Sequence, residues 1–301
     1  MKFHRLFLPG KIWSTRVTVD DLSATNSSGG HTVLSLGQPR IRWRKYHVEA
    51  VADPFLIVHK DRLWLFVEER RDYVPAYITA YSTNDLNNWV AHGTVLREKF
   101  HLSYPQVFES GGKHWMLPEA EASGGVILYE TLSLPAGWVR AETLIRQPLA
   151  DPTLFEKDGH FYIWGTDKNG TLRLFLSTQL RGPYSEHPCS PITANKRYSR
   201  CAGRILRAPN GSFVRLAQDC EKSYGENVNE INITSLTPSS YSERVAAHHI
   251  LSMQEQWNKY GTHHISTAVF LGKLVRAVDG LGPDRLWNNV PKAFWRACEK
   301  I

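Results

Sequence analysis

One short phrase recurs five times along the chain, and this repeat limits the folds that the chain can adopt. Each copy has a polar or Pro-marked start, a short apolar run, a turn with Gly, Asp or Asn, a second apolar run and a polar end. The copies are ADPFLIVHKDRLWLFVEE, YPQVFESGGKHWMLPEAE, ADPTLFEKDGHFYIWGTD, AGRILRAPNGSFVRLAQD and THHISTAVFLGKLVRAVD, beginning at Ala52, Tyr104, Ala150, Ala202 and Thr262. Counted from Pro54, Pro105, Pro152, Gly203 and His264, successive copies lie 51, 47, 51 and 61 positions apart. A period of about 50 residues built from strand patterns predicts the blades of a β-propeller.

The segments between the copies supply two more strands per repeat. YITAYSTNDLNNWVAHGTVL, VILYETLSLPAGWVRAETLI and LRLFLSTQLRGPYSEHPCSPI each hold two apolar runs around a polar turn. Short runs of Val, Ile, Leu, Phe and Trp between Gly, Pro, Asn and Asp are typical of strands buried between stacked sheets. We therefore predict an all-β fold, a five-bladed β-propeller with four-stranded antiparallel blades. The alternative is an ordinary sandwich with accidental internal similarity, which the near-identical spacings disfavour.

The length predicts one domain. The 301 residues give about 60 per blade, so we expect a single propeller over 1–301. Within the N-terminal part, 1–45, the segments KIWSTRVTV and HTVLSLG read as strands on either side of a short linker, SATNSSGG. We expect these strands to complete the last blade and close the ring. The pattern NVPKAFWRACEKI predicts a short C-terminal helix within a helical tail at 286–301.

Composition narrows the setting. No apolar stretch approaches the roughly 20 residues of a membrane span, and the start MKFHRLFLPGKIW lacks the continuous apolar run of a signal peptide. Four cysteines without CxxC spacing suit a reducing compartment, so we expect a cytoplasmic protein. The net charge of +7 would suit nucleic acid, an anionic membrane surface or an acidic glycan. Because the basic residues are scattered and no nucleic-acid motif is present, we expect no nucleic-acid partner, and a solvated basic surface explains the charge equally well.

The starts of the five copies are the candidate site. The first strand of each propeller blade begins near the axis, so the start residues converge in one funnel: Asp53, Tyr104, Asp151, Arg204 and His263 or His264. The ends of the second strands bring alongside Glu68, Glu119, Asp167, Gln218 and Asp279, with Asp219 next to Gln218. Carboxylates gathered with Arg, Tyr and His suit sugar recognition and glycosyl transfer. The alternative for any single residue is structural, since an Asp-Pro caps a turn and a buried Glu can bind backbone amides.

Two resemblances accompany these patterns. The Asp-Pro starts and the outer segments STNDLNNW and STQLRGPY resemble the five-bladed glycosidase superfamily of arabinanases, xylosidases and invertases. A closer resemblance covers residues 50–280 and is to the propeller at the N-terminus of plant glucosamine inositolphosphorylceramide transferases and related bacterial proteins. The segments that carry it are ADPFL, FVEE, HLSYPQVFE, MLPEAE, DPTLF, AGRIL, RLAQDC, YGENV and GTHHIST.

The superfamily resemblance implies roles for some of these residues. Asp53 matches its general base, and Asp151 matches the Asp that tunes the acid's pKa and orients the substrate. The general acid, a Glu in the fourth blade, is missing, because this chain has Ala202-Gly203-Arg204 there. The fifth blade of those enzymes offers a His to a central cation or bound water, so a cation near His263 or His264 is an open alternative. Otherwise we expect no metal and no cofactor, since a neutral imidazole often simply bonds a carboxylate.

Two function hypotheses remain, and catalysis stays open between them. The first is a carbohydrate-active enzyme that hydrolyses or transfers a glycosyl unit on a glycan or glycolipid, anionic ones included, with Asp53 as base or nucleophile, Glu119 as acid and Asp151 beside them. The second is a non-catalytic sugar-binding propeller that works with a separate glycosyltransferase partner. The ionisable funnel favours the first, and the missing Glu favours the second. The residues expected to bind substrate are Glu68, Tyr104, Arg204, Asp219, His263 and His264.

Two arguments from strand register and one from electrostatics give three further predictions. The turn at Asn210-Gly211 predicts that Cys201 and Cys220 are cross-strand partners within disulfide range. Trp64 and Trp115 each stand ten residues after the Pro of their copy, and Trp164 stands twelve after Pro152, displaced by one full alternation. All three should therefore share one strand face between blades. Crowding of carboxyl groups in the funnel should raise at least one pKa enough to leave a protonated acid near neutral pH.

Overall fold

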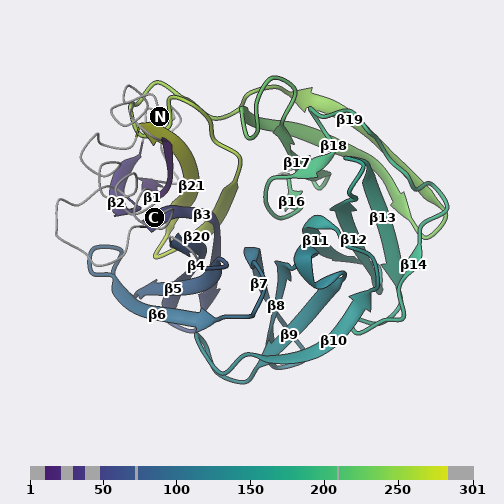
Figure 1. Cartoon of the computed structure of the whole chain (residues 1–301), viewed down its shortest axis with the longest axis horizontal. Coiled ribbons are helices and arrows are strands. Elements are labelled where there is room, and N and C mark those ends of the chain that lie inside the picture. Colours follow the sequence, from purple (N-terminus) through teal and green to yellow (C-terminus); the bar gives the residue numbers. More distant parts are fainter. Residues whose placement is uncertain (1–10, 22–29, 38–47, 72–73, 209, 284–301) are drawn as a thin grey trace, which may run out of the picture.

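The computed structural model describes residues 11–21, 30–37, 48–71, 74–208 and 210–283, and its regular structure is almost entirely β-strand. Figure 1 shows the sheets standing around a common centre, with the inner strands near the middle and the outer strands at the rim. Within these ranges there is one 3-10 turn, η2 at Glu121–Ser123. In the described part of the chain no helix has the length and apolar character to cross a membrane. The helical tail expected at 286–301 lies outside the described residues.

The second, third and fourth copies each build a separate antiparallel sheet. The second sheet contains β7 (Ser103–Ser110), β8 (Lys113–Glu119), β9 (Val126–Thr131) and β10 (Val139–Ile145). The third contains β11 (Ala150–Lys157), β12 (His160–Thr166), β13 (Leu172–Ser177) and β14 (Ser185–Glu186). The fourth contains β15 (Arg200–Cys201), β16 (Leu206–Arg207), β17 (Phe213–Asp219), β18 (Asn227–Thr237) and β19 (Ser240–Ala247).

The first and fifth copies lie in one eight-stranded sheet that divides into two four-stranded units. One unit contains β3 (Val48–His59), β4 (Arg62–Arg71), β5 (Tyr77–Thr83) and β6 (Val90–Leu96). The other contains β20 (Ile265–Phe270), β21 (Lys273–Pro283), β1 (Lys11–Asp21) and β2 (His31–Leu36). In the described residues the strand pairing between them is the parallel pair Trp13 with Ala50. The chain is therefore a β-propeller. The described part contains five such units, the fourth with its inner strand divided into β15 and β16, which is consistent with the predicted blade count.

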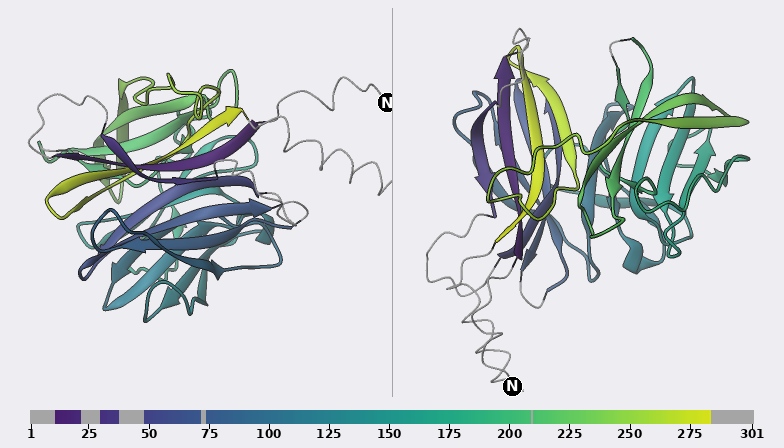
Figure 2. Two further views of the ribbon diagram at one scale, coloured as in Figure 1. Left: turned by 90° about the vertical axis from the view of Figure 1, so that its left-hand side faces the viewer. Right: turned by 90° about the horizontal axis from the view of Figure 1, so that it is seen from above.

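The N-terminal strands complete the unit of the fifth copy. β1 pairs with β21 along its whole length, from Lys11 with Pro283 to Asp21 with Lys273, and β2 pairs with the other edge of β1. Figure 2 shows the purple β1 beside the yellow β21. The two N-terminal strands and the C-terminal repeat thus share one sheet, as the sequence predicted.

The three matching tryptophans pack between neighbouring sheets. We call the unit β3–β6 the first sheet. Trp64 packs with residues of the first and second sheets, Trp115 with the second and third, and Trp164 with the third and fourth. Their exposed fractions are 8%, 6% and 0%, so all three belong to the core. The prediction of one shared strand face is confirmed, because each ring faces the following sheet.

The cysteine register was predicted wrongly. Cys201 pairs with Ala217, and Cys220 stands three residues further along. The physical reason is a break in the inner strand, since the chain leaves the ladder after Cys201 and rejoins it with Leu206 opposite Val214. The break adds two residues to one side of the hairpin, and the pair nearest the turn, Arg207 with Phe213, is already one residue away from the predicted centring. Together they give the offset of three. Both thiols are free.

Candidate functional site

The starts of the inner strands share one backbone irregularity. Asp53, Tyr104 and Asp151 have φ values of 51°, 48° and 49°, in the left-handed region that non-glycine residues rarely adopt. The pairing register shifts beside each of them, which marks a β-bulge, and Gly203 has a φ of 142° at the equivalent place in the fourth copy. Bulges redirect side chains and are common beside functional sites, so these positions are where a site is expected.

One half of the polar cluster at the axis comes from the eight-stranded sheet. The Asp279 carboxylate accepts hydrogen bonds from the backbone N–H groups of Asp53, His263 and His264, at 3.2, 2.9 and 3.0 Å. Its Oδ2 also lies 2.5 Å from Nδ1 of His263. The Asp53 Oδ1 atom is 3.9 Å from the same ring nitrogen. Because Asp279 and His263 are buried, their ion pair is shielded from water.

The protonation of this half follows from its contacts. Burial alone would raise the pKa of Asp279, but His263 holds it below its ordinary value. Burial alone would lower the pKa of His263, but Asp279 outweighs it and raises the value to about 9. Burial raises the pKa of Asp53 to about 7. At neutral pH the Asp279–His263 pair is therefore ionised, whereas Asp53 is close to half protonated.

Arg200 organises the other half of the cluster. Its Nε donates a hydrogen bond to Oδ2 of Asp151 at 2.7 Å, and its Nη2 lies 3.6 Å from Oε2 of Glu119. Gln218 donates to the same Asp151 oxygen at 2.9 Å, and the Asp151 N–H donates to Glu119 at 3.0 Å. These four side chains come from β8, β11, β15 and β17, so the second, third and fourth sheets meet here.

Electrostatics link the two halves. Burial, reinforced by the charge of Asp151, raises the pKa of Glu119 well above its ordinary value. Burial likewise raises the pKa of Glu68 to about 8, with a further contribution from Asp53, and Asp151 contributes to the raised pKa of Asp53. These shifts agree with the expectation of a protonated carboxyl near neutral pH. A carboxyl that keeps its proton at that pH can serve as a general acid.

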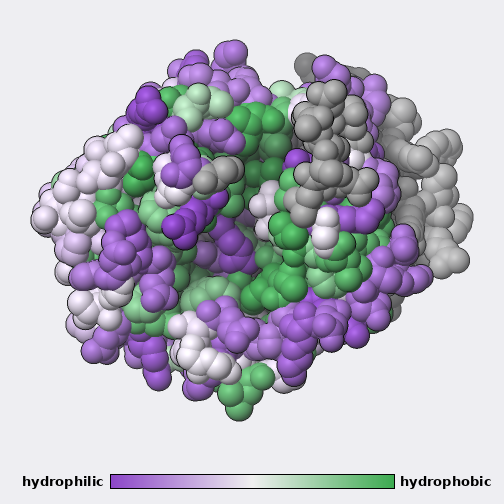
Figure 3. All heavy atoms as spheres, turned by 180° about the vertical axis from the view of Figure 1, so that it is seen from behind, coloured by the Kyte–Doolittle hydropathy of each residue, from purple (hydrophilic) through white to green (hydrophobic). Residues whose placement is uncertain are grey.

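The cluster reaches solvent beside aromatic rings. The Arg200 side chain is 25% exposed, and Tyr224, whose ring lies 5.2 Å from the guanidinium carbon, is 50% exposed. Trp13 stacks on His263 with ring centroids 4.0 Å apart, and Tyr224 meets both rings edge-on. Figure 3 shows the face behind Figure 1 hollowed near its centre, with hydrophilic atoms in the hollow. Polar groups beside aromatic rings are typical of small-ligand sites.

Tyr104 belongs to the packed wall of the axis. Its hydroxyl lies 2.8 Å from the Thr153 hydroxyl, accepts from the Gly203 N–H at 2.8 Å and lies 2.9 Å from the Gly203 carbonyl oxygen. The Tyr104 N–H donates to Asp53 at 3.2 Å. The phenol is therefore fully engaged within the protein, and only the backbone of Tyr104 contacts the cluster.

Arg204 and His264 also belong to the packed interior. Arg204 donates to the carbonyl oxygens of Leu56 and Val107 at 3.0 and 2.6 Å, and its guanidinium lies over the ring of Phe55. His264 is 0% exposed, and burial lowers its pKa to about 3, so the ring is neutral. The structure does not bring Arg204 to the carboxylates, and Arg200 stands in the place expected for it.

The remaining predicted residues divide between the cluster and its surroundings. Glu68 lies at the edge, with Oε1 3.3 Å from Nε2 of His101. Asp219 is turned elsewhere, because its Oδ2 lies 3.0 Å from Nε2 of His249. His264, although buried, has its Nδ1 3.7 Å from Oδ1 of Asp53. The predicted residues that the structure gathers are Asp53, Glu68, Glu119, Asp151, Gln218, His263, His264 and Asp279.

The geometry can also be tested against a central cation. Asp53, His263 and Asp279 each offer one ligand atom, and these atoms lie within 4.8 Å of one another. Nδ1 of His263 already pairs with Asp279, so a cation here would have to take the place of the imidazole proton. The geometry as it stands is that of a buried ion pair.

Three residues of the site escaped the sequence reasoning. Arg200 stands just before the fourth copy as we delimited it, so the repeat did not mark it as a site residue. Trp13 comes from the predicted strand KIWSTRVTV, whose pairing with the fifth copy places it over His263. Tyr224 lies in a segment without any strand pattern, so nothing in the sequence indicated that its ring reaches the cluster.

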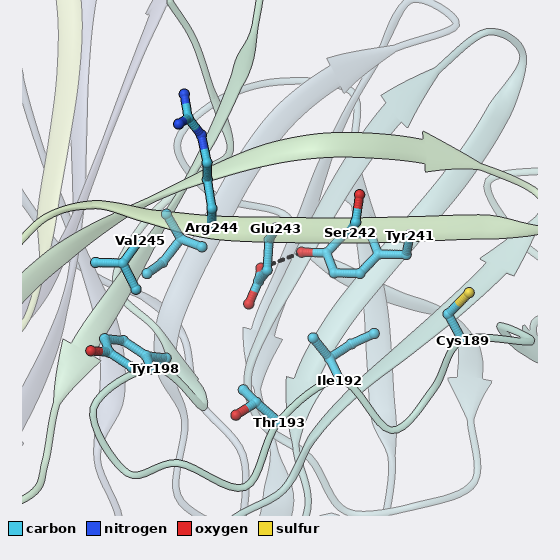
Figure 4. A pocket seen from close by; sticks show the side chains of 10 residues that line it. Cys189, Ile192, Thr193, Tyr198, Tyr241, Ser242, Glu243, Arg244 and Val245 are labelled. Carbon is cyan, nitrogen blue, oxygen red and sulfur yellow. Dashed lines mark hydrogen bonds between the residues drawn. The ribbon is translucent and has the colours of Figure 1, made fainter.

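Two hollows lie on the fourth sheet, lined by residues outside the cluster. The first, of about 380 Å³, lies between β19 and the segment 189–198 (Figure 4). Its carboxylate, Glu243, accepts a hydrogen bond from Tyr241 and pairs with buried Arg215 at 2.9 and 2.6 Å. The second, of about 540 Å³, lies near the turn 210–213. Because Glu243 is engaged, the first hollow offers no free carboxylate for chemistry.

The part of the chain that matches known proteins includes most of the described strands and the carboxylates of the axial cluster. Residues 39–281 match the family described as glucosamine inositolphosphorylceramide transferase 1, N-terminal. Glucosamine inositolphosphorylceramide transferase 1 of Arabidopsis thaliana is 30% identical over 245 residues, which cover 76% of this chain and 32% of the plant protein. The chain thus spans about one third of the length of the curated relatives it matches.

Solved structures of carbohydrate-active enzymes share the fold. The α-L-arabinofuranosidase PaAbf62A of Podospora anserina, solved with cellotriose, has a TM-score of 0.58 and 11% identity, over 82% of this chain and 94% of that one. The β-1,2-mannobiose phosphorylase of Listeria innocua, solved with β-1,2-mannobiose, has a TM-score of 0.61 and 11% identity, over 80% and 92%. At such identity the likeness shows the β-propeller fold alone.

Proposed function

Because the chain belongs to the family of the N-terminal region of glucosamine inositolphosphorylceramide transferase 1, we propose that its axial cluster binds the sugar part of a glycan or glycolipid. The observation that carries this proposal is the convergence of Asp53, Glu119 and Asp151 below the partly exposed Arg200. The structural relatives include enzymes solved with oligosaccharides, which supports the same class of ligand.

The charge balance favours an uncharged sugar. Arg200 is paired with Asp151, and His263 is paired with Asp279. An anionic sugar would have to displace one of these carboxylates from its cation. Sugar hydroxyls, in contrast, can donate to the carboxylates and accept from Arg200 without breaking either pair. Trp13 and Tyr224 offer apolar ring surface beside these polar groups.

The proposed chemistry is glycosyl hydrolysis or transfer with Glu119 as acid and Asp53 as base. Protonated Glu119 gives its proton to the oxygen of the leaving group. Asp53, with a pKa of about 7, takes a proton from water in hydrolysis or from an acceptor hydroxyl in transfer. Asp151 holds Arg200 and, through its N–H, holds Glu119 in place.

A second candidate is a sugar-binding module without catalysis, working with a glycosyltransferase partner. One observation favours it: the start of the fourth copy carries Gly203 and Arg204, and Tyr104 and backbone oxygens occupy their polar groups. The matched region covers only 32% and 34% of two of the relatives, which leaves room in them for a separate transferase region. A cytoplasmic location belongs to the same proposal, and the free thiols support it.

A ligand and turnover screen tests both candidates. Wild-type protein and the variants D53N and E119Q are titrated calorimetrically with a neutral pentose, a hexose, glucosamine and a uronic acid, and assayed on their aryl glycosides. D219N serves as a matched control, because Asp219 faces His249 outside the cluster.

The outcomes separate the candidates. Turnover lost in D53N with binding retained indicates the enzyme. Binding without turnover in any variant indicates the module. If the wild type binds no sugar, or if D53N and E119Q bind and turn over like D219N, the axial site is not the sugar site.

A further inference from the structure

Two histidines and a glutamate meet at the turn ends of the first two inner hairpins. His59 ends β3, Glu109 lies in β7, and His114 lies in β8. Each offers one ligand atom, and the three atoms lie within 4.8 Å of one another. His59 follows Asp53 by six residues of strand, or about 20 Å at roughly 3.3 Å per residue. This cluster is therefore separate from the proposed sugar site.

Regular strands and short turns hold the three side chains. Glu109 and His114 are direct cross-strand partners, so their side chains lie on the same face of the second sheet. The turn between their strands contains Gly111 and Gly112, with φ values of 60° and 73° that suit glycine. His59 closes the ladder of the neighbouring hairpin opposite Arg62. The cluster thus bridges the first and second sheets.

His114 is the unusual member of the group. It is 4% exposed, and neither of its ring nitrogens has a hydrogen-bond partner among the described residues. Its Nε2 lies 3.8 Å from Oε2 of Glu109, and Nδ1 of His59 lies 3.3 Å from the same oxygen. A buried polar group without a partner destabilises the folded state. A ligand bound to the His114 ring would therefore stabilise the fold more than a ligand bound to an exposed imidazole.

We propose that His59, Glu109 and His114 bind a divalent transition-metal ion, with zinc as the first choice, and that the ion ties the first inner hairpin to the second. Two imidazoles and one carboxylate are ligands that zinc accepts in a tetrahedral site. Bonds of 2.0–2.2 Å place tetrahedral ligand atoms about 3.4 Å apart. The separations of 3.3 and 3.8 Å are close to that spacing, so small side-chain rotations complete the site.

The surroundings agree with this assignment. The His59 and His114 rings meet edge-on, with centroids 4.3 Å apart, beside the Glu109 carboxylate. The ammonium group of Lys60 acts against a cation there, and the half-exposed Glu109 supplies the compensating charge. Three protein ligands leave the fourth position to water, which can approach from the exposed side of Glu109.

Zinc titration of the full chain tests the proposal. Tag-free, chelator-treated protein is titrated calorimetrically with zinc sulfate, and cobalt(II) absorption reports the coordination. We expect one site in the wild type and an affinity lower by about tenfold or more in both H59A and E109A. The control H160A removes a histidine from the equivalent hairpin of the third sheet, and D53N removes a ligand atom from the axial cluster.

Thermal melting gives an independent readout. Zinc should raise the melting temperature of the wild type, H160A and D53N, and leave that of H59A and E109A unchanged. H114Q, checked by circular dichroism for folding, should lose zinc binding as well. Equal affinity in H59A, E109A and the wild type, loss of zinc binding only in D53N, or no zinc binding by the wild type would each overturn the assignment. None of these results depends on sugar binding, so the proposed function can fail or stand independently.

Discussion

Trp64 and Trp164 both pack in the core between neighbouring sheets, but in the described part of the chain only the indole of Trp164 has a hydrogen-bond partner. Trp164 donates from Nε1 to the Tyr241 hydroxyl at 3.2 Å, whereas Nε1 of Trp64 is buried and finds no acceptor in the described part of the chain. Replacing either by Ala removes a core ring and should lower the free energy of unfolding by about 3–5 kcal/mol. Burial of roughly 150–250 Å² at about 25 cal/mol per Å² gives a similar range, near 4–6 kcal/mol.

Replacement by Phe separates the two positions. W64F removes the unpartnered N–H, whose burial costs about 1–3 kcal/mol, and this gain offsets most of the lost packing. W164F removes a donor that has a partner and leaves a gap beside the Tyr241 hydroxyl, so it should be the more destabilising change by about 1–2 kcal/mol. Urea unfolding followed by two probes, with coincident transitions as a check on cooperativity, measures both.

The reasoning has a clear failing result. If W64A unfolds within about 1 kcal/mol of the wild type, Trp64 is not in the core between the first two sheets. If W64F costs as much as W164F, the missing hydrogen bond of Trp64 has no energetic weight, and the comparison of the two indoles fails.

Three further predictions concern pH, charge and thiols. Asp279 raises the pKa of His263 from 6.5 to about 9, so the contribution of this pair to stability is fully present below pH 6.5. Up to about 3 kcal/mol of it is lost as pH rises through 9. In D279N the urea midpoint at pH 6.5 should therefore equal the midpoint at pH 10. R200M leaves buried carboxyls without their cation and should destabilise the fold by about 1–3 kcal/mol. This is less than for a fully buried pair, because Arg200 is 25% exposed. Adding an Asp151→Asn change should restore part of the loss in the same unfolding assay. Cys201 and Cys220 should form no mutual disulfide under mild oxidation, because their offset of three residues places them about 10 Å apart along the strands; a crosslinked peptide in mass spectrometry would contradict the register.

The fold was predictable because its period is long and its inner strands are largely buried. Repeated apolar runs at a fixed spacing leave few other ways to cover both faces of each sheet. The break after Cys201 was not predictable in the same way. Gly203 was its single local signal, and one glycine does not say how many residues leave the ladder.

The site was predictable only where the repeat itself positions the residue. Asp53 and Asp151 sit on equivalent bulges, so their convergence followed from the alignment of the copies. Gln218 and Asp219 show the limit, because neighbouring strand residues point to opposite faces. Gln218 therefore reaches Asp151, while Asp219 reaches His249, and the sequence alone did not tell which would face the axis.

The placement of β1 between β21 and β2 has a consequence for synthesis. Ser14, in β1, donates a hydrogen bond to the Gly280 carbonyl oxygen across 266 positions of sequence. During translation β1 emerges before every other described strand, yet its longest partner is the last one to appear. Until then the edge of β1 that pairs with β21 has no native partner. Trp13 is not yet held in place either, so it cannot stack on His263. On the ribosome the repeats can form in order, but the closing of the circle, and with it the aromatic side of the axial site, must wait until β21 has been synthesised.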